Sequence, residues 1–238
     1  MGRCDRGQGW LRTAGVSFLL AALAAPAAVG SESAAVDSEC AACDDELEAS
    51  TVGVNEGKLS FLAEPPPKAV HHHHNDIVIG PESLREGWVR LEQCHEHLDA
   101  VPRAEVVYPP GRIRGVSVAS SRGIDRAWVE GPSLQLEGVQ RGAELCVKAE
   151  SRAFSAEQDG AYTLHNGPYM RRFLDGYYPM RVTMTVRYPC DRLRFAGSKP
   201  EPQPGFTVRD RDCRVDVEAW FEGRLQTELR FLPTTASP

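Results

Sequence analysis

Six of the seven histidines in this 238-residue chain fall into two short groups whose spacing suits metal binding. Four are consecutive, from His71 to His74, and two follow Cys94 at positions 95 and 97. If the second group lies on an extended strand, side chains at i and i+2 point to the same face, about 6–7 Å apart. That spacing suits two imidazoles on one Zn²⁺ or Cu²⁺, with a third imidazole from the first group.

The predicted metal ligands are His71, His72, His73, His74, His95 and His97, with Asp76, Glu96 and His165 as supplementary ligands. Such a site would be structural or would carry the metal, because no motif beside it indicates catalysis. The alternative is that the run is a surface loop without metal, and that His95 and His97 are only exposed or hydrogen-bonded.

A second group of residues is typical of recognition surfaces. Arg171, Arg172, Tyr177 and Tyr178 lie close together in YMRRFLDGYYP, and Tyr and Arg are enriched where proteins bind partners. We predict a partner-binding segment here. The alternative is that Tyr169, Phe173 and Leu174 plug the end of a sandwich while the arginines pair with nearby acids.

Six cysteines remain once Cys4, which lies in the leader, is set aside, and an even number predicts disulfides in an oxidising compartment. The predicted pairs are Cys40–Cys43, Cys94–Cys146 and Cys190–Cys213. A redox role for Cys40 and Cys43 is disfavoured by their acidic neighbours. Haem attachment is disfavoured because Asp44, not histidine, follows the second cysteine.

The first thirty residues predict export. A basic segment precedes the apolar run AGVSFLLAALAA, and Ala28 and Gly30 suit cleavage before Ser31. The alternative is a membrane anchor or a buried helix, which the short run disfavours. No later stretch reaches the roughly 18 apolar residues of a transmembrane helix. The mature chain is therefore expected in the periplasm or secreted, without a transmembrane span.

The rest of the chain predicts a mainly β protein. Residues 31–68 are expected to form an acidic, proline-rich arm. Alternating segments then recur about every ten residues, most clearly at 180–188, where Met180, Val182 and Met184 share a face. We predict an antiparallel β-sandwich, immunoglobulin-like or related, as two lobes (69–156 and 157–238) or one continuous sandwich (69–238). A short helix is expected from Pro168 to Gly176, and a hairpin turn at Glu222–Gly223.

Composition narrows the function. Removing residues 1–30 takes three Arg and one Asp from 27 basic and 33 acidic residues, which leaves 24 and 32 and a net charge of −8. An acidic chain disfavours nucleic-acid binding, which needs a basic face. No nucleophile elbow, nucleotide loop or metalloprotease motif is present, so no catalytic residue is predicted.

The leading prediction is an extracytoplasmic, non-catalytic accessory protein that binds a protein or glycan of the cell envelope. A copper- or zinc-binding periplasmic protein is the first alternative. A hydrolase acting on the envelope, with a site that only the fold assembles, is the second.

Overall fold

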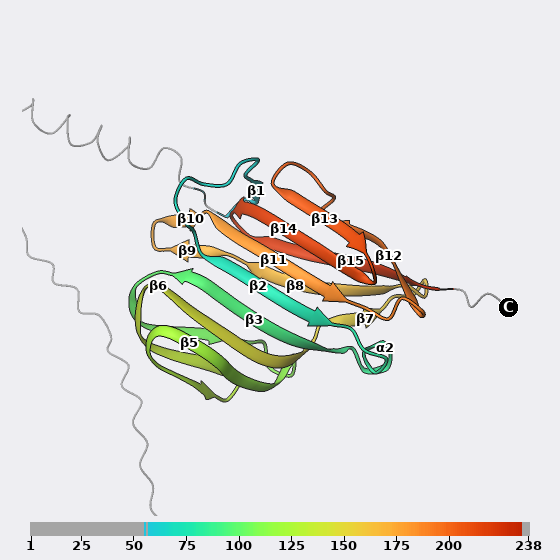
Figure 1. Ribbon diagram of the computed structural model, residues 1–238, viewed down its shortest axis with the longest axis horizontal. Coiled ribbons are helices and arrows are strands. Elements are labelled where there is room, and N and C mark those ends of the chain that lie inside the picture. The colour runs from blue at the N-terminus through green and yellow to red at the C-terminus, as the bar shows by residue number, and fades with distance from the viewer. Residues whose placement is uncertain (1–54, 56, 235–238) are drawn as a thin grey trace, which may run out of the picture. The chain divides into compact units, whose positions relative to one another are not determined.

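The computed structural model describes Asn55 and residues 57–234. The predicted leader, the Cys40–Cys43 pair and most of the predicted arm lie outside these residues. The described part is almost entirely β, as predicted (Figure 1). Its one helix, α2 (Ser83–Glu86), is not long and apolar enough to cross a membrane.

Nine strands form the main sheet, in the order β1-β14-β11-β2-β3-β6-β4, with β13 added on β14 and β5 on β6. Its pairs are antiparallel except β2 with β11, which run parallel. The bounds are β1 (Ser60–Phe61), β2 (His72–Val78), β3 (Trp88–Leu98), β4 (Val101–Val107), β5 (Ile113–Glu130), β6 (Ser133–Arg152), β11 (Met180–Arg187), β13 (Phe206–Arg211) and β14 (Arg214–Glu222).

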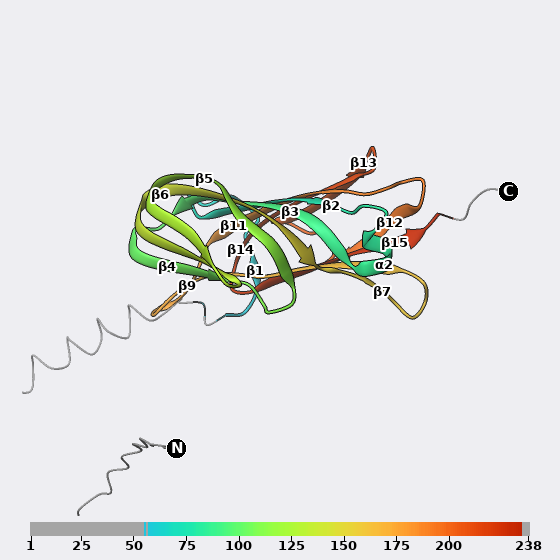
Figure 2. The ribbon, with the colours of Figure 1, turned by 90° about the horizontal axis from the view of Figure 1, so that it is seen from below.

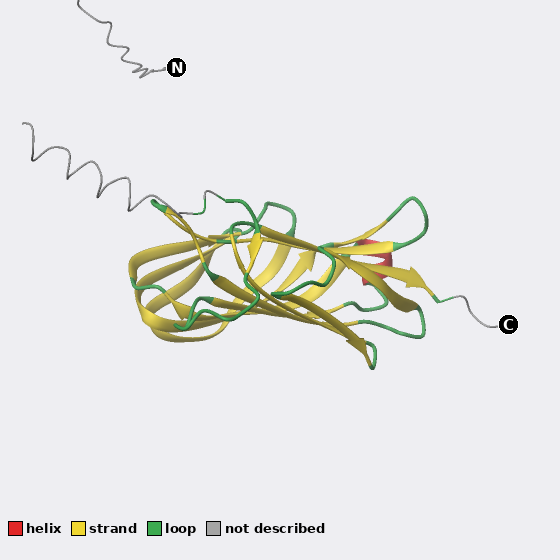
Figure 3. Cartoon of the chain, turned by 90° about the horizontal axis from the view of Figure 1, so that it is seen from above, coloured by secondary structure: helices red, strands yellow, loops and turns green. Residues whose placement is uncertain are grey.

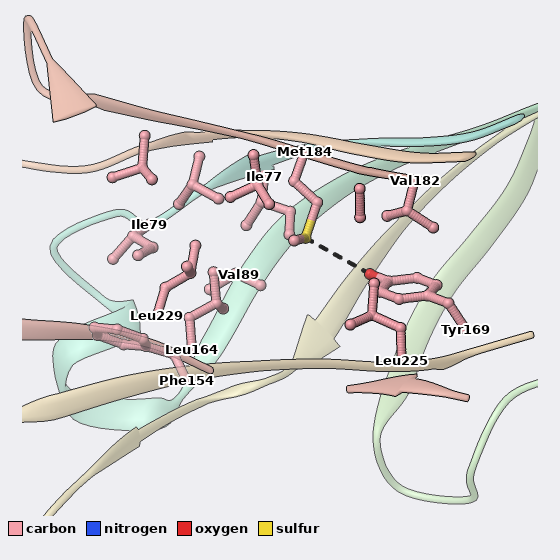
Figure 4. Close-up of a cluster of buried hydrophobic side chains, with 14 of the residues drawn as sticks. Ile77, Ile79, Val89, Phe154, Leu164, Tyr169, Val182, Met184, Leu225 and Leu229 are labelled. Carbon is pink, nitrogen blue, oxygen red and sulfur yellow. Dashed lines mark hydrogen bonds between the residues drawn. The ribbon is translucent and has the colours of Figure 1, made fainter. Parts of the chain in front are cut away.

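A four-stranded sheet, in the order β12-β15-β8-β7, packs on one face of the main sheet and completes a sandwich. Its strands are β7 (Phe154–Ala156), β8 (Tyr162–Tyr169), β12 (Leu193–Lys199) and β15 (Leu225–Pro233). The core between the sheets comes from strict alternation. On β11 every second residue is buried, beginning with Met180, because alternate side chains point to the same face of a strand. Figure 4 shows Met184 facing the Tyr169 hydroxyl near one end of this core.

The predicted hairpin at Glu222–Gly223 is wrong. β14 belongs to the main sheet and β15 to the small sheet, so this turn crosses between the two layers. Both strands bury one apolar face, which packs toward the same core from opposite sides. The turn requires glycine at 223, since φ is +89° and a Cβ there would lie 2.2 Å from the Lys58 carbonyl oxygen.

Beyond the sandwich, β4, β5 and β6 curl into what we call the roll (Figure 2 and Figure 3). β5 has 18 residues and would be about 60 Å long if straight. Val107 pairs with Ser133 at one end of β6, and Ile113 pairs with Ser151 at the other end. The link from Val107 to Ile113 is nevertheless at most about 20 Å long. The β5–β6 hairpin must therefore bend back on itself. Three register shifts in β5, one of them at the left-handed Gly123, allow that bend.

The roll has its own apolar core, separate from that of the sandwich. Its buried residues are Leu134, Leu136, Val139, Ala143, Leu145 and Val147. All of them lie on β6, whereas the sandwich core draws on β2, β3 and the second half of the chain. The two cores therefore do not follow the predicted lobes 69–156 and 157–238. The chain also joins the body before residue 69, because Leu59 and Phe61 already pack against the sandwich core.

Two of the predicted disulfides are confirmed. Cys94–Cys146 links directly opposed residues of β3 and β6, and Cys190–Cys213 links the segments that follow β11 and precede β14. The first ties β3 to β6 of the roll.

The helix predicted from Pro168 to Gly176 is also wrong. The segment contains the end of β8 and a two-stranded hairpin of β9 (Arg171–Phe173) and β10 (Gly176–Tyr178). The turn residues are Leu174 and Asp175, and Gly176 pairs with Phe173 at a φ of +141°, which glycine adopts without steric cost. We call residues Arg171–Tyr178 the tongue.

Candidate functional site

The histidine run is the beginning of a central strand, not a surface loop. β2 starts at His72 between β3 and β11, and its side chains alternate between the two faces of the main sheet. His73 and Asn75 are buried on the inner face, whereas His72 and His74 lie on the outer face and are half-buried. The strand therefore divides the run into two groups that cannot share a ligand.

His95 and His97 do not share a face, so that part of the metal prediction is wrong. A register shift interrupts the β3–β6 pairing between His95 and Leu98, and His97 takes a left-handed φ of 56°. This irregularity breaks the two-residue alternation on which the prediction rested. His95 is buried opposite His73, and His97 is exposed.

Five polar residues form what we call the polar seam, between the sandwich core and the roll core: His71, His73, Asn75, Gln93 and His95. His71 Nε2 lies 3.0 Å from His95 Nδ1, and Gln93 Nε2 lies 2.9 Å from His95 Nε2. On β2, His73 Nε2 lies 3.1 Å from Asn75 Oδ1. The rings of His73 and His95 have centroids 4.3 Å apart. Two imidazoles and two carboxamides are thus buried on one sheet face, with the half-buried His71 beside them.

Two tyrosines close the ends of this network. The Asn75 amide donates to the Tyr169 hydroxyl at 2.6 Å, and Tyr169 donates to Met184 Sδ at 3.7 Å. On the roll side, the Tyr108 hydroxyl donates to Gln93 Oε1 at 3.2 Å. Burial raises the pKa of both phenols, that of Tyr108 to about 12. Both tyrosines therefore remain neutral donors.

The inner imidazoles are uncharged at neutral pH. Burial lowers the pKa of His71 to about 4 and that of His95 to about 3, and it places the pKa of His73 well below 6.5. The Asp99 carboxylate opposes the effect at His71, and the neighbouring Arg171 adds to it. A cluster of neutral imidazoles can accept and relay hydrogen bonds, or donate lone pairs to a metal.

The outer group has a different chemistry. Glu96 Oε2 lies 3.0 Å from His72 Nδ1, and His72 Nε2 lies 2.7 Å from Thr183 Oγ1. His74 Nδ1 contacts the same hydroxyl at 2.8 Å. The Glu96 carboxylate, the His72 imidazole and the Thr183 hydroxyl thus form a hydrogen-bonded chain in the same order as the catalytic triad of acyl-transfer enzymes. However, Thr183 is in mid-strand on the outer face, and none of these three residues lines the hollow beside Arg90 and Lys148 or the one beside Pro102 and Gln140.

The supplementary ligands are dispersed. Asp76 pairs with Arg187 and Glu96 with His72, while His165 is on the small sheet near Glu157 and Glu228. Within residues 55 and 57–234, no group of three or more His, Cys, Asp or Glu side chains is arranged to hold a metal ion. The predicted six-histidine site is therefore not assembled as a whole.

The tongue brings the predicted partner-binding residues together. Arg171 pairs with Tyr178 and Arg172 with Tyr177 across its two strands, and the Arg172 guanidinium lies 5.5 Å from the Tyr177 ring. Phe173 is exposed and Leu174 is fully exposed at the turn. Of the plug alternative, Tyr169 is buried and Arg171 pairs with an acid, whereas Phe173 and Leu174 are exposed.

Two contacts hold the tongue on the body. Arg171 binds Asp99 through two hydrogen bonds of 2.8 and 2.9 Å, and the Tyr177 amide donates to the Asn55 carbonyl at 2.9 Å. Asp99 lies in the link between β3 and β4, so the tongue is fastened beside the open edge of the polar seam.

Sequence reasoning missed Asn75, Gln93, Thr183 and Asp99. A signal for the first two was present, because each carboxamide stands two residues from a histidine in an extended segment and therefore shares its face. Thr183 and Asp99 had no such signal, since strand pairing over long sequence separations brings them to the histidines and to Arg171.

Comparisons with known proteins do not identify the chain. No family model and no curated protein matches it. Among solved structures it is similar to a mutant two-domain M1 zinc metallopeptidase bound to L-tryptophan, with a TM-score of 0.36 and 12% identity. The match covers 75% of this chain and 43% of that chain. A likeness this weak carries no argument about function.

Proposed function

We propose that this protein is exported and acts as a non-catalytic β-sandwich accessory protein that binds a protein of the cell envelope through its tongue. The observation that carries the proposal is the tip of the tongue, where Phe173 and the fully exposed Leu174 stand beside arginines and tyrosines. Tyr and Arg are among the residues enriched in protein-binding hot spots, and the exposed Phe173 and Leu174 add apolar contact area beside them.

The rigidity of the tongue supports the same proposal. Arg171 is held by Asp99, and Arg172 stacks near Tyr177, so binding would order few additional side chains. A preformed surface loses less entropy on association than a flexible one. Export is supported by the leader-like sequence of residues 1–30 and by two disulfides, which persist in oxidising compartments.

The hydrolase alternative is less well supported. Glu96, His72 and Thr183 are suitably ordered, but the residues around them form an open sheet face with alternating charges. Acyl transfer or glycan cleavage needs a concave site that excludes water and positions the substrate. We therefore prefer the binding function.

Site-specific photocrosslinking tests the proposal. A photoreactive phenylalanine analogue replaces Leu174 in the exported protein, and the matched control carries it at Val107, which is 65% exposed on β4. We expect one discrete envelope-protein adduct from position 174 and none from position 107. The adduct should be lost when Phe173→Ser or Arg172→Ala is added. Identical adducts from both positions, or none from either, would contradict the proposal.

A further inference from the structure

Each strand of the polar seam repeats one arrangement. On β2 the inward pair is His73 and Asn75, and on β3 it is His95 and Gln93; the two imidazoles are opposed, as are the two carboxamides. Both carboxamides contact the Nε2 atom of their own histidine, at 3.1 and 2.9 Å. Metal-binding histidines usually use their far nitrogen in this way, because the second hydrogen bond fixes the ring and its tautomer.

The second ring nitrogen of His95 is not used by Gln93 and faces His71. His71 Nε2 and His95 Nδ1 already point at each other across 3.0 Å. Two nitrogens bound to one tetrahedral ion at about 2.0–2.1 Å are about 3.3 Å apart, so this pair needs to open by only a few tenths of an ångström. His73 keeps its Nδ1 free of hydrogen bonds to neighbouring side chains among the described residues.

We propose that the polar seam binds one Cu²⁺ or Zn²⁺ ion through His71 Nε2, His95 Nδ1 and His73 Nδ1, with Gln93 and Asn75 positioning the rings. His71 and His95 form the half of the site that is in place. The His73 ring centroid is 4.3 Å from that of His95 but 6.5 Å from that of His71, so His73 turns to complete the site. Because the His73 ring must first rotate, no group of three ligands is arranged to hold a metal ion among the described residues.

The proton balance of the site is simple. With Gln93 donating to His95 Nε2, the proton of His95 is on Nδ1 and is shared with His71 Nε2. On metal binding this proton moves to Nε2, and the Gln93 amide turns so that its oxygen accepts. No proton leaves the ring.

The ligand set determines the class of metal. Three neutral imidazoles suit copper and zinc, whereas calcium and magnesium require oxygen ligands. The Asp99 carboxylate, close enough to influence the charge of His71, is the nearest compensation for the charge of the ion. His71 is the one ligand that is not fully buried, so the ion enters at the open edge where the tongue is fastened. The site is independent of the partner-binding tip.

Metal titration of the untagged mature protein tests the site. After stripping with EDTA and desalting, Cu²⁺ and Zn²⁺ are titrated separately by calorimetry, and bound metal is counted by mass spectrometry. We expect one ion per chain, with Cu²⁺ tighter than Zn²⁺. His71→Ala and His95→Gln should weaken binding at least 100-fold. The matched control, His72→Ala with His74→Ala on the outer face of the same strand, should retain it.

Two further measurements keep the result interpretable. Gln93→Leu should weaken binding about 10-fold or more while the ligands remain, which a surface site would not show. Electron paramagnetic resonance of the Cu²⁺ form should show coupling to three nitrogens. Near-ultraviolet circular dichroism checks that each variant is folded. The proposal is overturned if binding follows His72 and His74, if His71→Ala binds as tightly as the parent, or if the stripped protein binds no stoichiometric ion.

Discussion

His73 and His74 are neighbours in the sequence, yet they lie on opposite faces of one strand and have different roles. His73 is buried between two apolar cores and bonded to Asn75, whereas His74 is half-buried beside Thr183 among charged side chains. The inner environment suppresses charge, and the outer one tolerates it. A run of identical residues in a strand therefore does not form one site, because alternate side chains point to opposite faces of the sheet. The following predictions test this contrast, from the largest expected effect to the smallest.

A buried charge should separate the two faces most strongly. We expect His73→Asp to lower the free energy of unfolding by about 3–5 kcal/mol, because its carboxylate would be buried without a positive partner. The matched His74→Asp change should cost no more than about 1 kcal/mol. Urea denaturation monitored by tryptophan fluorescence measures both. Equal losses would mean that the two faces do not differ as described.

Acid should destabilise the metal-free protein through the inner histidines. Their pKa values in the folded state are depressed, so the unfolded chain binds more protons below pH 6.5, and stability falls as the pH drops from about 6.5 toward 4. At pH 5 we expect a loss of about 2 kcal/mol each for His71 and His95, relative to pH 7. Chelator-treated protein is unfolded with urea at pH 7, 6 and 5. The pH dependence should weaken in His95→Gln, and a flat profile in the parent would refute the assignment.

The tongue offers a second paired comparison. Arg171→Ala removes the two hydrogen bonds to Asp99, and we expect a loss of about 1–2 kcal/mol and faster amide exchange in residues 171–178. Arg172→Ala should change stability by less than about 0.5 kcal/mol, yet reduce partner crosslinking. Hydrogen exchange read by mass spectrometry distinguishes them. Unchanged exchange in Arg171→Ala would show that Asp99 does not hold the tongue.

The smallest effect is expected on the outer face. Thr183→Val keeps the side-chain shape and removes the hydroxyl that His72 and His74 share. We expect a cost of about 0.5–1 kcal/mol, since both imidazoles can exchange this partner for water. Thermal unfolding of the two proteins side by side measures it. A loss above about 2 kcal/mol would indicate that this hydroxyl is structurally essential.

Much of the fold was predictable because it depends on local alternation. The strand 180–188 and the β3 segment from Trp88 have a two-residue pattern that only an extended chain can bury on one side, and both are strands. The pairs Cys94–Cys146 and Cys190–Cys213 were predicted because each pair lies within one apparent structural unit, beside strong strand patterns. Two of the structural errors, the helix at 168–176 and the hairpin at 222–223, arose where a turn signal had two meanings. Glycine occurs at helix ends, in hairpin turns and in connections between sheets, and the sequence alone does not distinguish these cases.

The candidate site was predictable in its residue types and not in its grouping. The sequence alone determined a mainly β chain, a leader-like beginning, an acidic mature segment and an unusual density of histidines near residues 71–97. Only the tertiary structure decided that β2 lies between β3 and β11, that the irregularity after His95 moves His97 away, and that Asn75 and Gln93 join the inner imidazoles. Local patterns assign a side chain to a face, but strand order and register decide what it meets there, because those contacts join residues far apart along the chain.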